Sequence, residues 1–209
     1  MDMKQTVIDN PILAIMRNIP MEKVLNYVGA ATEGGVGFFE VALNSKDAYE
    51  QIKLLKKNFK NISIGAGTAI TVERAKAAIE AGADFLLSPS TDEDVLAYCQ
   101  KNQITIMPGA LTPSDVSKCL RYGFPVIKLF PAGDMPMGYI KSLKGPFDET
   151  EYVAIGGVNK ENMAQFFHQG YLGVGIGSNI IPKEMILRDA WDEASACAAE
   201  LAAIAKSFR

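Results

Sequence analysis

Short apolar segments alternate with amphipathic stretches along the chain, and this alternation limits the possible folds more than any other feature. Strands separated by helices are typical of repeated βα units, in which the strands run parallel. Eight segments are predicted as strands: Ile12–Met16, Phe38–Leu43, Ile62–Gly65, Phe85–Ser88, Thr105–Met107, Val126–Leu129, Tyr152–Ile155 and Gly173–Ile176. Eight parallel strands in 209 residues predict an α/β protein with a compact (β/α)₈ TIM barrel.

The intervening stretches predict helices near Met21–Thr32, Asp47–Phe59, Val72–Ala81, Asp92–Asn102, Pro113–Tyr122, Tyr139–Lys144 and Lys160–Gln169, and a terminal helix around Leu187–Ser207. Thr71 and Thr112 are predicted N-caps. Three predicted helix ends carry a glycine, at Gly82, Gly123 and Gly170. An open, doubly wound sheet is the alternative fold, but no GxGxxG turn follows the first predicted strand.

Composition limits the class of protein. Hydrophobic residues make up 48% of the chain and no Pro/Ser-rich linker interrupts it, so one domain over residues 1–209 is expected. The net charge of -3 and the lack of a basic stripe argue against a nucleic-acid partner. No apolar run approaches the ~20 residues of a membrane span, and the first residues lack the regions of a signal peptide. A cytoplasmic location without a membrane partner is therefore expected.

Cysteine and histidine usage limits the possible sites. Cys99, Cys119 and Cys197 are odd in number and lack CxxC spacing, so neither a disulfide framework nor a zinc site is indicated. They are interpreted as buried thiols in or beside helices. His168 is the single histidine, which excludes a histidine-rich metal cluster, and it is interpreted as a structural residue near a helix end.

Two ionisable residues stand inside apolar segments that resemble strands. Lys128 ends the run Phe124–Ile127, and Glu40 interrupts Phe38–Leu43. Burial lowers the pKa of a lysine and makes its amine nucleophilic near neutral pH, so a Schiff-base lysine with an acid/base carboxylate is one interpretation. The other is a lysine that extends to the surface at the strand end and pairs with a carboxylate.

The carboxyl ends of the strands form the functional face of a barrel, and the residues found there are polar or conformationally special. They are Arg17, Glu40 with Asn44, residues 65–68, residues 88–90, Pro108 with Gly109, Lys128, Gly156 with Gly157, and Gly177 with Ser178. The glycines after the last two strands occupy the place where barrels often bind phosphate. Arg17 would offer a bidentate donor to a carboxylate. Ordinary turns, a helix cap and a surface arginine are the alternative interpretations.

Seven segments carry more specific motifs: Pro11–Arg17, Glu40–Ser45, Ile64–Thr68, Ser88–Pro89, Met107–Gly109, Lys128–Pro131 and Gly156–Val158. In order and spacing they resemble the KDPG/KHG aldolase family of class I aldolases, which cleave 2-keto-3-deoxy-6-phosphogluconate or 4-hydroxy-2-oxoglutarate. The resemblance implies a homotrimeric barrel in Entner–Doudoroff-type carbohydrate metabolism. It implies catalytic roles for Lys128 (Schiff base) and Glu40 (acid/base). It also implies that Arg17 and Thr68 bind the pyruvate carboxylate, that Pro89 and Phe130 line its pocket, and that Gly156, Gly157, Gly177 and Ser178 bind phosphate.

Two positions bear on the substrate. Family members selective for the gluconate substrate usually carry Thr where this chain has Ile155, and some carry arginine in place of Asn44. The combination found here looks more like the subfamily that acts on 2-keto-3-deoxy-6-phosphogalactonate. The expected products are pyruvate and D-glyceraldehyde 3-phosphate, with no metal or organic cofactor, because the imine acts as the electron sink. A sugar-phosphate isomerase or epimerase, or a non-catalytic phosphometabolite-binding barrel in which Lys128 pairs with Glu40, remain the alternatives.

Overall fold

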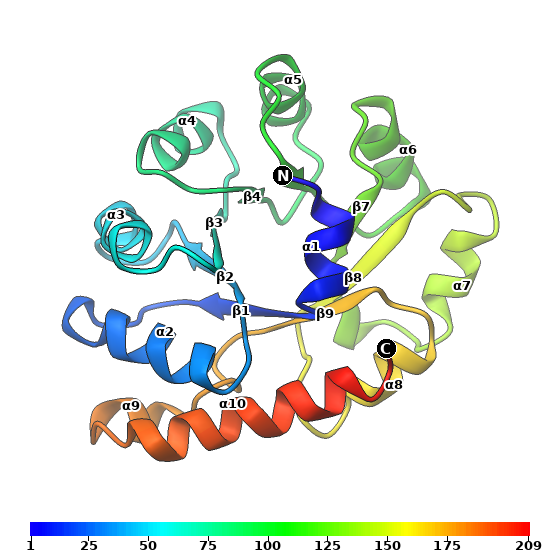
Figure 1. The fold of residues 1–209 in the computed structure, drawn as a ribbon. Coiled ribbons are helices and arrows are strands. Elements are labelled where there is room, and N and C mark those ends of the chain that lie inside the picture. The colour runs from blue at the N-terminus through cyan, green and yellow to red at the C-terminus, as the bar shows by residue number, and fades with distance from the viewer.

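The computed structural model describes residues 1–209, and its strands form a closed barrel surrounded by helices (Figure 1). All strand pairs are parallel, in the order β5-β4-β3-β2-β1-β9-β8-β7-β6. The terminal segments of this order, β5 (Ile106–Met107) and β6 (Gly109–Ala110), are consecutive in the chain and are separated only by Pro108. The sheet therefore closes on itself through residues 106–110, and nine strand segments make the eight strands of a barrel. The predicted fold class is confirmed.

Each predicted strand is present in the structure. The other strands are β1 (Ile12–Met16), β2 (Phe38–Ala42), β3 (Ser63–Gly67), β4 (Leu86–Leu87), β7 (Val126–Leu129), β8 (Glu151–Ile155) and β9 (Gly173–Ile176). Three of them, β1, β7 and β9, have the predicted bounds. The fifth predicted strand, Thr105–Met107, corresponds to β5, and β6 lies beyond its predicted end. Pro108 separates the two segments because it has no N–H for the ladder, although its carbonyl still accepts from the N–H of Lys128 at 2.9 Å.

The helices lie outside the barrel. They are α2 (Val24–Glu33), α3 (Ala48–Asn58), α4 (Val72–Glu80), α5 (Glu93–Lys101), α6 (Pro113–Arg121), α7 (Tyr139–Lys144), α8 (Met163–His168), α9 (Lys183–Leu187) and α10 (Trp191–Lys206), with 3₁₀ turns η1 (Met21–Lys23) and η2 (Ala132–Asp134). Thr71 and Thr112 are N-caps, as predicted. Gly82, Gly123 and Gly170 have positive φ beyond the ends of α4, α6 and α8. The predicted terminal helix, around Leu187–Ser207, corresponds to α10, which begins later, at Trp191, after Asp189 with its φ of 57°. The short helix α9 before it was not predicted.

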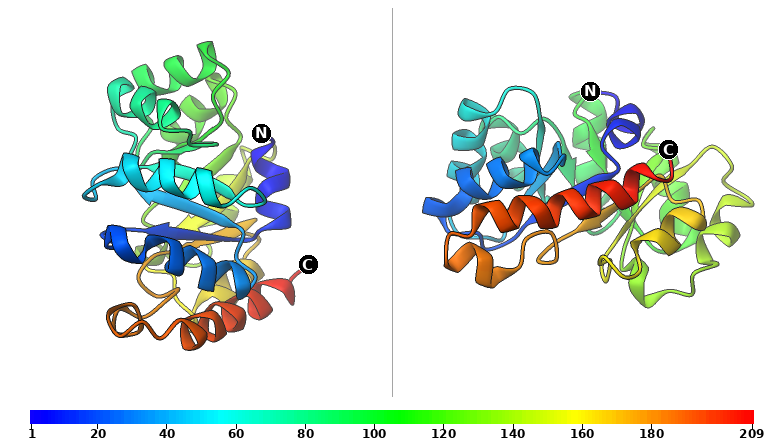
Figure 2. Two further views of the ribbon diagram at one scale, coloured as in Figure 1. Left: turned by 60° about the vertical axis from the view of Figure 1, so that its left-hand side comes forward. Right: turned by 60° about the horizontal axis from the view of Figure 1, so that its bottom comes forward.

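A helix that the sequence analysis did not predict, α1 (Met3–Asp9), crosses the amino-terminal end of the barrel (Figures 1 and 2). Asp2 caps it by accepting from the N–H of Gln5. Met3 and Val7 are buried, and Val7 lies so close to Gly173 that a Cβ there would approach it to 2.6 Å. Three apolar residues in a segment of seven, Met3, Val7 and Ile8, give too little periodicity to predict this helix.

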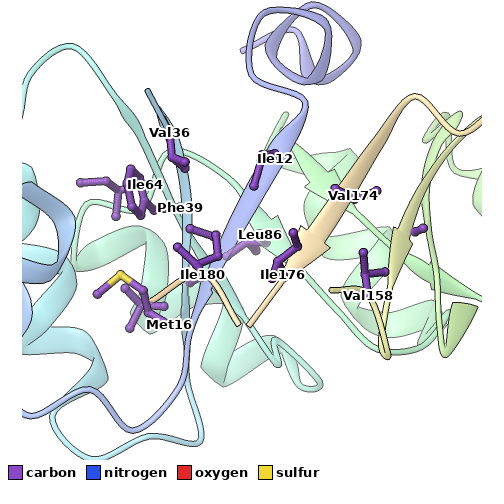
Figure 3. Close-up of a cluster of buried hydrophobic side chains, with 14 of the residues drawn as sticks. Ile12, Met16, Val36, Phe39, Ile64, Leu86, Val158, Val174, Ile176 and Ile180 are labelled. Carbon is purple, nitrogen blue, oxygen red and sulfur yellow. The ribbon is translucent and has the colours of Figure 1, made fainter. Parts of the chain in front are cut away.

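The strands are buried on both faces, which explains their almost continuous apolar sequences. Outward-facing residues pack against the helices, and Figure 3 shows Ile12, Met16, Phe39, Val174 and Ile176 among them. Inward-facing residues form a separate cluster under α1: Leu13, Phe38, Phe85, Leu87, Met107, Val126, Val153 and Ile155, together with Met3 and Val7 of the helix. This inner cluster fills the amino-terminal part of the barrel.

The three cysteines and the single histidine all lie in helices. Cys99 and Cys119 are buried in α5 and α6, and burial raises the pKa of each thiol to about 12. Cys197 in α10 is only half-buried, in contrast to the prediction, because the broad surface of α10 is partly open to solvent. His168 ends α8, and its ring packs edge-on against Phe208 at 4.8 Å between centroids. None of the helices has both the length and the apolar character of a membrane span.

Candidate active site

Glu40 and Lys128 enter the barrel from the same inward-facing register that builds the apolar cluster. Glu40 lies two residues after Phe38 on β2, and Lys128 lies two residues after Val126 on β7. Alternate residues of a strand point to the same face, so both charged side chains stand above the inner cluster, at the carboxyl end of the barrel. Glu40 is 2% exposed and Lys128 is 7% exposed.

This end of the barrel contains a cavity of about 600 Å³. All ten site residues predicted from the sequence line it: Arg17, Glu40, Thr68, Pro89, Lys128, Phe130, Gly156, Gly157, Gly177 and Ser178. They come from seven of the eight barrel strands or the connections that follow them. The structure therefore brings the whole predicted set together around one cavity.

Burial changes the acid–base properties of the two central residues in opposite directions. It lowers the pKa of Lys128, an effect that the charge of Glu40 opposes and the charge of Arg17 reinforces. It raises the pKa of Glu40, while the positive charges of Lys128 and Arg17 act against this rise. No hydrogen bond joins Lys128 to Glu40, and they interact only through space. This geometry argues against both a surface lysine and a simple structural ion pair.

Close packing fixes where the carboxyl group of Glu40 lies. The space that a Cβ at Gly67 would need is occupied by Glu40, whose Oε1 would lie 1.5 Å from it. Only glycine at position 67 leaves room for the carboxylate in this position. On the other side of the cavity, the Nζ atom of Lys128 lies 4.8 Å from the ring centroid of Phe130, which is 37% exposed at the mouth.

The segment that carries Arg17 is held by residues that the sequence analysis did not identify as functional. Asn18 has a φ of 56°, and its N–H donates to the Oγ of Ser45 at 3.0 Å. The Nε2 of Gln51, a side chain 1% exposed, donates to the carbonyl of Ile19 at 2.8 Å. A glutamine on the buried face of a predicted amphipathic helix needs a hydrogen-bond partner, so the sequence indicated that Gln51 makes a buried polar contact but not with which segment.

Thr68 stands in an unusual backbone conformation, with a φ of 60°. Its carbonyl accepts from the Nη1 of Arg74 at 3.3 Å, which holds the turn after β3. Its Oγ1 lies 3.5 Å from the Oδ1 of Asn44, so Asn44 contacts a cavity residue without lining the cavity itself. Ile155, in contrast, is part of the cavity wall.

The glycine segments after β8 and β9 present a group of free backbone donors. The N–H groups of Gly156, Gly157, Gly177 and Ser178 donate to no acceptor within the protein. Gly156 and Gly157 have φ values of 91° and 76°, which favour glycine. Their carbonyls accept hydrogen bonds from the N–H of Gly133 and from Asn162 Nδ2, both at 2.8 Å. An anion could bind here without meeting a free carbonyl of either glycine.

A buried amine without an ion-pair partner, next to a buried carboxyl group at the mouth of a barrel, defines a protein suited to imine chemistry. Residues 3–197 match the family model described as KDPG and KHG aldolase. The chain belongs to this family.

Two curated relatives and one solved structure illustrate the similarity. The chain is 31% identical over 173 residues to the 2-dehydro-3-deoxy-6-phosphogalactonate aldolase of Escherichia coli K12, covering 81% of this chain and 84% of the relative. It is 31% identical over 180 residues to the 2-dehydro-3-deoxy-phosphogluconate aldolase of Treponema pallidum, covering 84% and 83%. The KDPG aldolase of Legionella pneumophila, with pyruvate captured as a covalent carbinolamine, has a TM-score of 0.88 at 29% identity, covering 95% and 97% of the two chains.

Proposed function

We propose that this protein is a class I aldolase that cleaves a 2-keto-3-deoxy-6-phospho-sugar acid to pyruvate and D-glyceraldehyde 3-phosphate. The observation that carries the proposal is the buried Lys128, which has a lowered pKa and faces the cavity beside Glu40 without pairing with it. Membership of the aldolase family and the carbinolamine in the Legionella relative support it.

The reaction starts with the neutral amine of Lys128, which attacks the C2 ketone of the substrate. The carbinolamine loses water, and the resulting iminium withdraws electrons from the bond between C3 and C4. Glu40 takes the proton of the C4 hydroxyl as this bond breaks, so that the aldehyde product leaves and a pyruvate enamine remains. Glu40 then returns the proton to C3, and water hydrolyses the iminium to release pyruvate and restore the amine. A carboxyl group with a raised pKa is suited to both proton transfers.

The other cavity residues are proposed to hold the two ends of the substrate. Arg17 and Thr68 bind the carboxylate of the pyruvate unit, with Arg17 acting as the charged donor. Pro89 and Phe130 form the apolar wall beside the reacting carbons.

The free N–H groups of Gly156, Gly157, Gly177 and Ser178 are proposed to bind the phosphate. Their arrangement after the last two strands is the usual phosphate position in a barrel.

The substrate is proposed to be the phosphogalactonate or the phosphogluconate. Named relatives of both kinds are equally identical to this chain, at 31%. Ile155 lines the cavity without a hydroxyl group, so it offers no hydrogen bond that would discriminate between the C4 epimers. We expect the phosphogalactonate to be cleaved at least as well as the phosphogluconate.

Assembly as a homotrimer and a cytoplasmic location are part of this proposal, carried by the resemblance to the family. The chain mass is 22.6 kDa, so light scattering on the purified protein should give about three times this value. A mass equal to that of one chain would refute the trimer.

Pyruvate capture tests the proposal directly. Incubation with pyruvate followed by borohydride should add one reduced pyruvate adduct per chain, located on Lys128 by mass spectrometry, and cleavage should continue in EDTA. The replacement of Lys76, an exposed lysine of α4, by methionine is a matched control that should leave capture unchanged. Capture at another lysine, or cleavage without any capture, would refute the assignment. An isomerase, an epimerase or a binding protein would form no reducible adduct.

A further inference from the structure

The roles proposed above leave part of the cavity unassigned. Beyond the glycine segments, its wall continues along the connection from β1 to α2, the first turn of α2, and the segment that leads into α9. Most side chains here are apolar, including Ile19, Pro20 and Ile186. Four are polar: Asn18, Asn179, Tyr27 and Lys183. Among these four, Lys183 is the one cation and Tyr27 is the one in a helix and buried.

Tyr27 is a buried residue whose hydroxyl group forms no hydrogen bond within the protein. The residue lies in the first turn of α2, is 2% exposed and lines the cavity. Burial is the one cause that raises its pKa, and no hydrogen bond contributes, so the hydroxyl keeps its proton and remains a donor. The hydroxyl is not among the fully buried polar atoms without a partner, which are Thr32 Oγ1 and the Tyr152 hydroxyl, so it is accessible from the cavity and can donate to a ligand there.

Lys183 is the only cation of the cavity wall without a role. Four acidic or basic side chains line the cavity: Arg17, Glu40, Lys128 and Lys183. The first three act at the keto-acid end of the substrate. A phosphate ester carries a charge of about −1.5 to −2 at pH 7, and backbone N–H groups alone do not balance it. Lys183 forms no ion pair with any protein carboxylate, as its absence from every salt bridge of the structure indicates.

Both side chains line the same cavity as the proposed phosphate site. Lys183 follows Gly177 and Ser178 along the same connection, at the start of α9. Lys23, directly before α2, pairs with Asp189, shortly after α9, at 2.5 Å, which ties these two elements together. Figures 1 and 2 show α9 beside α2 near one end of α10. Tyr27, Ile181 and Ile186 all line the cavity, so α2 and this connection both contribute to its wall.

On the basis of the proposed function, we propose that Lys183 and Tyr27 complete the phosphate end of the cavity. The ammonium group balances the phosphate charge, and the hydroxyl donates to one phosphate oxygen. Together they make the enzyme select phosphorylated over unphosphorylated keto acids.

Binding of sn-glycerol 3-phosphate, measured by titration calorimetry, tests this inference without any catalytic step. Tyr27→Phe keeps the ring in the core and removes only the hydroxyl, so its Kd should rise roughly tenfold, as for other donors to charged groups. Lys183→Met should raise Kd about 5- to 20-fold, and less so in high salt, because Lys183 is exposed. Lys183→Arg should restore most of the affinity, and Lys76→Met is the control for loss of one positive charge.

Kinetics should show the same selection. The ratio of kcat/KM for the phosphorylated keto acid to that for its unphosphorylated form should fall in Tyr27→Phe and Lys183→Met, mainly through KM. Unchanged glycerol 3-phosphate binding in both variants, or equal losses for both substrates, would overturn the inference. Pyruvate capture does not involve the phosphate end. If the protein binds glycerol 3-phosphate through Lys183 and Tyr27 but captures no pyruvate, their role at the phosphate end would be supported and the aldolase assignment would be refuted.

Discussion

Phe38 and Val126 lie in the apolar cluster under α1, whereas Glu40 and Lys128, two residues further along the same two strands, line a cavity that opens to solvent. The amino-terminal end of the barrel is filled by side chains and covered by a helix, and the carboxyl end is left open, with Glu40 and Lys128 facing the cavity without an ion pair between them. A single inward-facing register therefore produces both ends. The comparison predicts that substitutions at the amino-terminal end change the free energy of unfolding, and that substitutions at the carboxyl end change catalysis.

The largest expected effect is on turnover, at the open end. Glu40→Gln should lower kcat by about 10²- to 10⁴-fold, because it removes the group that moves protons at C4 and C3. The free energy of unfolding should remain close to that of the wild type, since no hydrogen bond or ion pair restrains Glu40. Glu80→Gln, an exposed change on α4, is the matched control. A loss of less than about fivefold in kcat would mean that another residue transfers the protons.

The closed end should show the opposite behaviour. Phe38→Ala should lower the free energy of unfolding by about 3–5 kcal/mol, because it removes a fully buried ring and leaves a cavity below the site. Urea denaturation measures this change. Activity per folded molecule should be largely retained. A variant as stable as the wild type but inactive would break the division of the barrel into a structural end and a chemical end.

A smaller effect is expected at Ile155, which belongs to the inner cluster and also lines the cavity. Ile155→Thr should shift the ratio of kcat/KM for phosphogluconate to that for phosphogalactonate towards gluconate by roughly two- to tenfold, the value of one hydrogen bond. Ile155→Val is the control, because it keeps the branched shape without a hydroxyl. An unchanged kcat/KM ratio in the threonine variant would mean that Ile155 contributes to packing and not to substrate selection.

The smallest effects concern the pH dependence of imine formation at saturating pyruvate. The capture rate should rise with pH as Lys128 loses its proton, with a midpoint below the ordinary lysine value of 10.5, because burial lowers its pKa. Glu40→Gln should move the midpoint to lower pH, since the charge of Glu40 raises the pKa of Lys128. Arg17→Gln should move it to higher pH, since the charge of Arg17 lowers that pKa. Shifts in the same direction in both variants would contradict the electrostatic description of the site.

The sequence predicted the strands and the site because both depend on local patterns. The inward residues of β2 and β7 alternate with outward ones, so the position of an ionisable residue within an apolar run indicated which end of the barrel it would reach. Features that depend on contacts between distant segments were not predictable. The hydrogen bond from the N–H of Asn18 to Ser45 and the one from Gln51 to the carbonyl of Ile19 join segments distant in sequence, as does the approach of Tyr27 to the cavity.

The contact between Gly67 and Glu40 has an evolutionary consequence. The carboxylate occupies the volume that a methyl group at position 67 would fill, so neither position is free to change alone. Alanine at 67 would displace the acid from the reacting carbons, and an acid shorter by one methylene at position 40 would leave a void beside Gly67. Gly67→Ala combined with Glu40→Asp should therefore retain more activity than the product of the two single effects. In related chains, these two positions are expected to vary as a coupled pair.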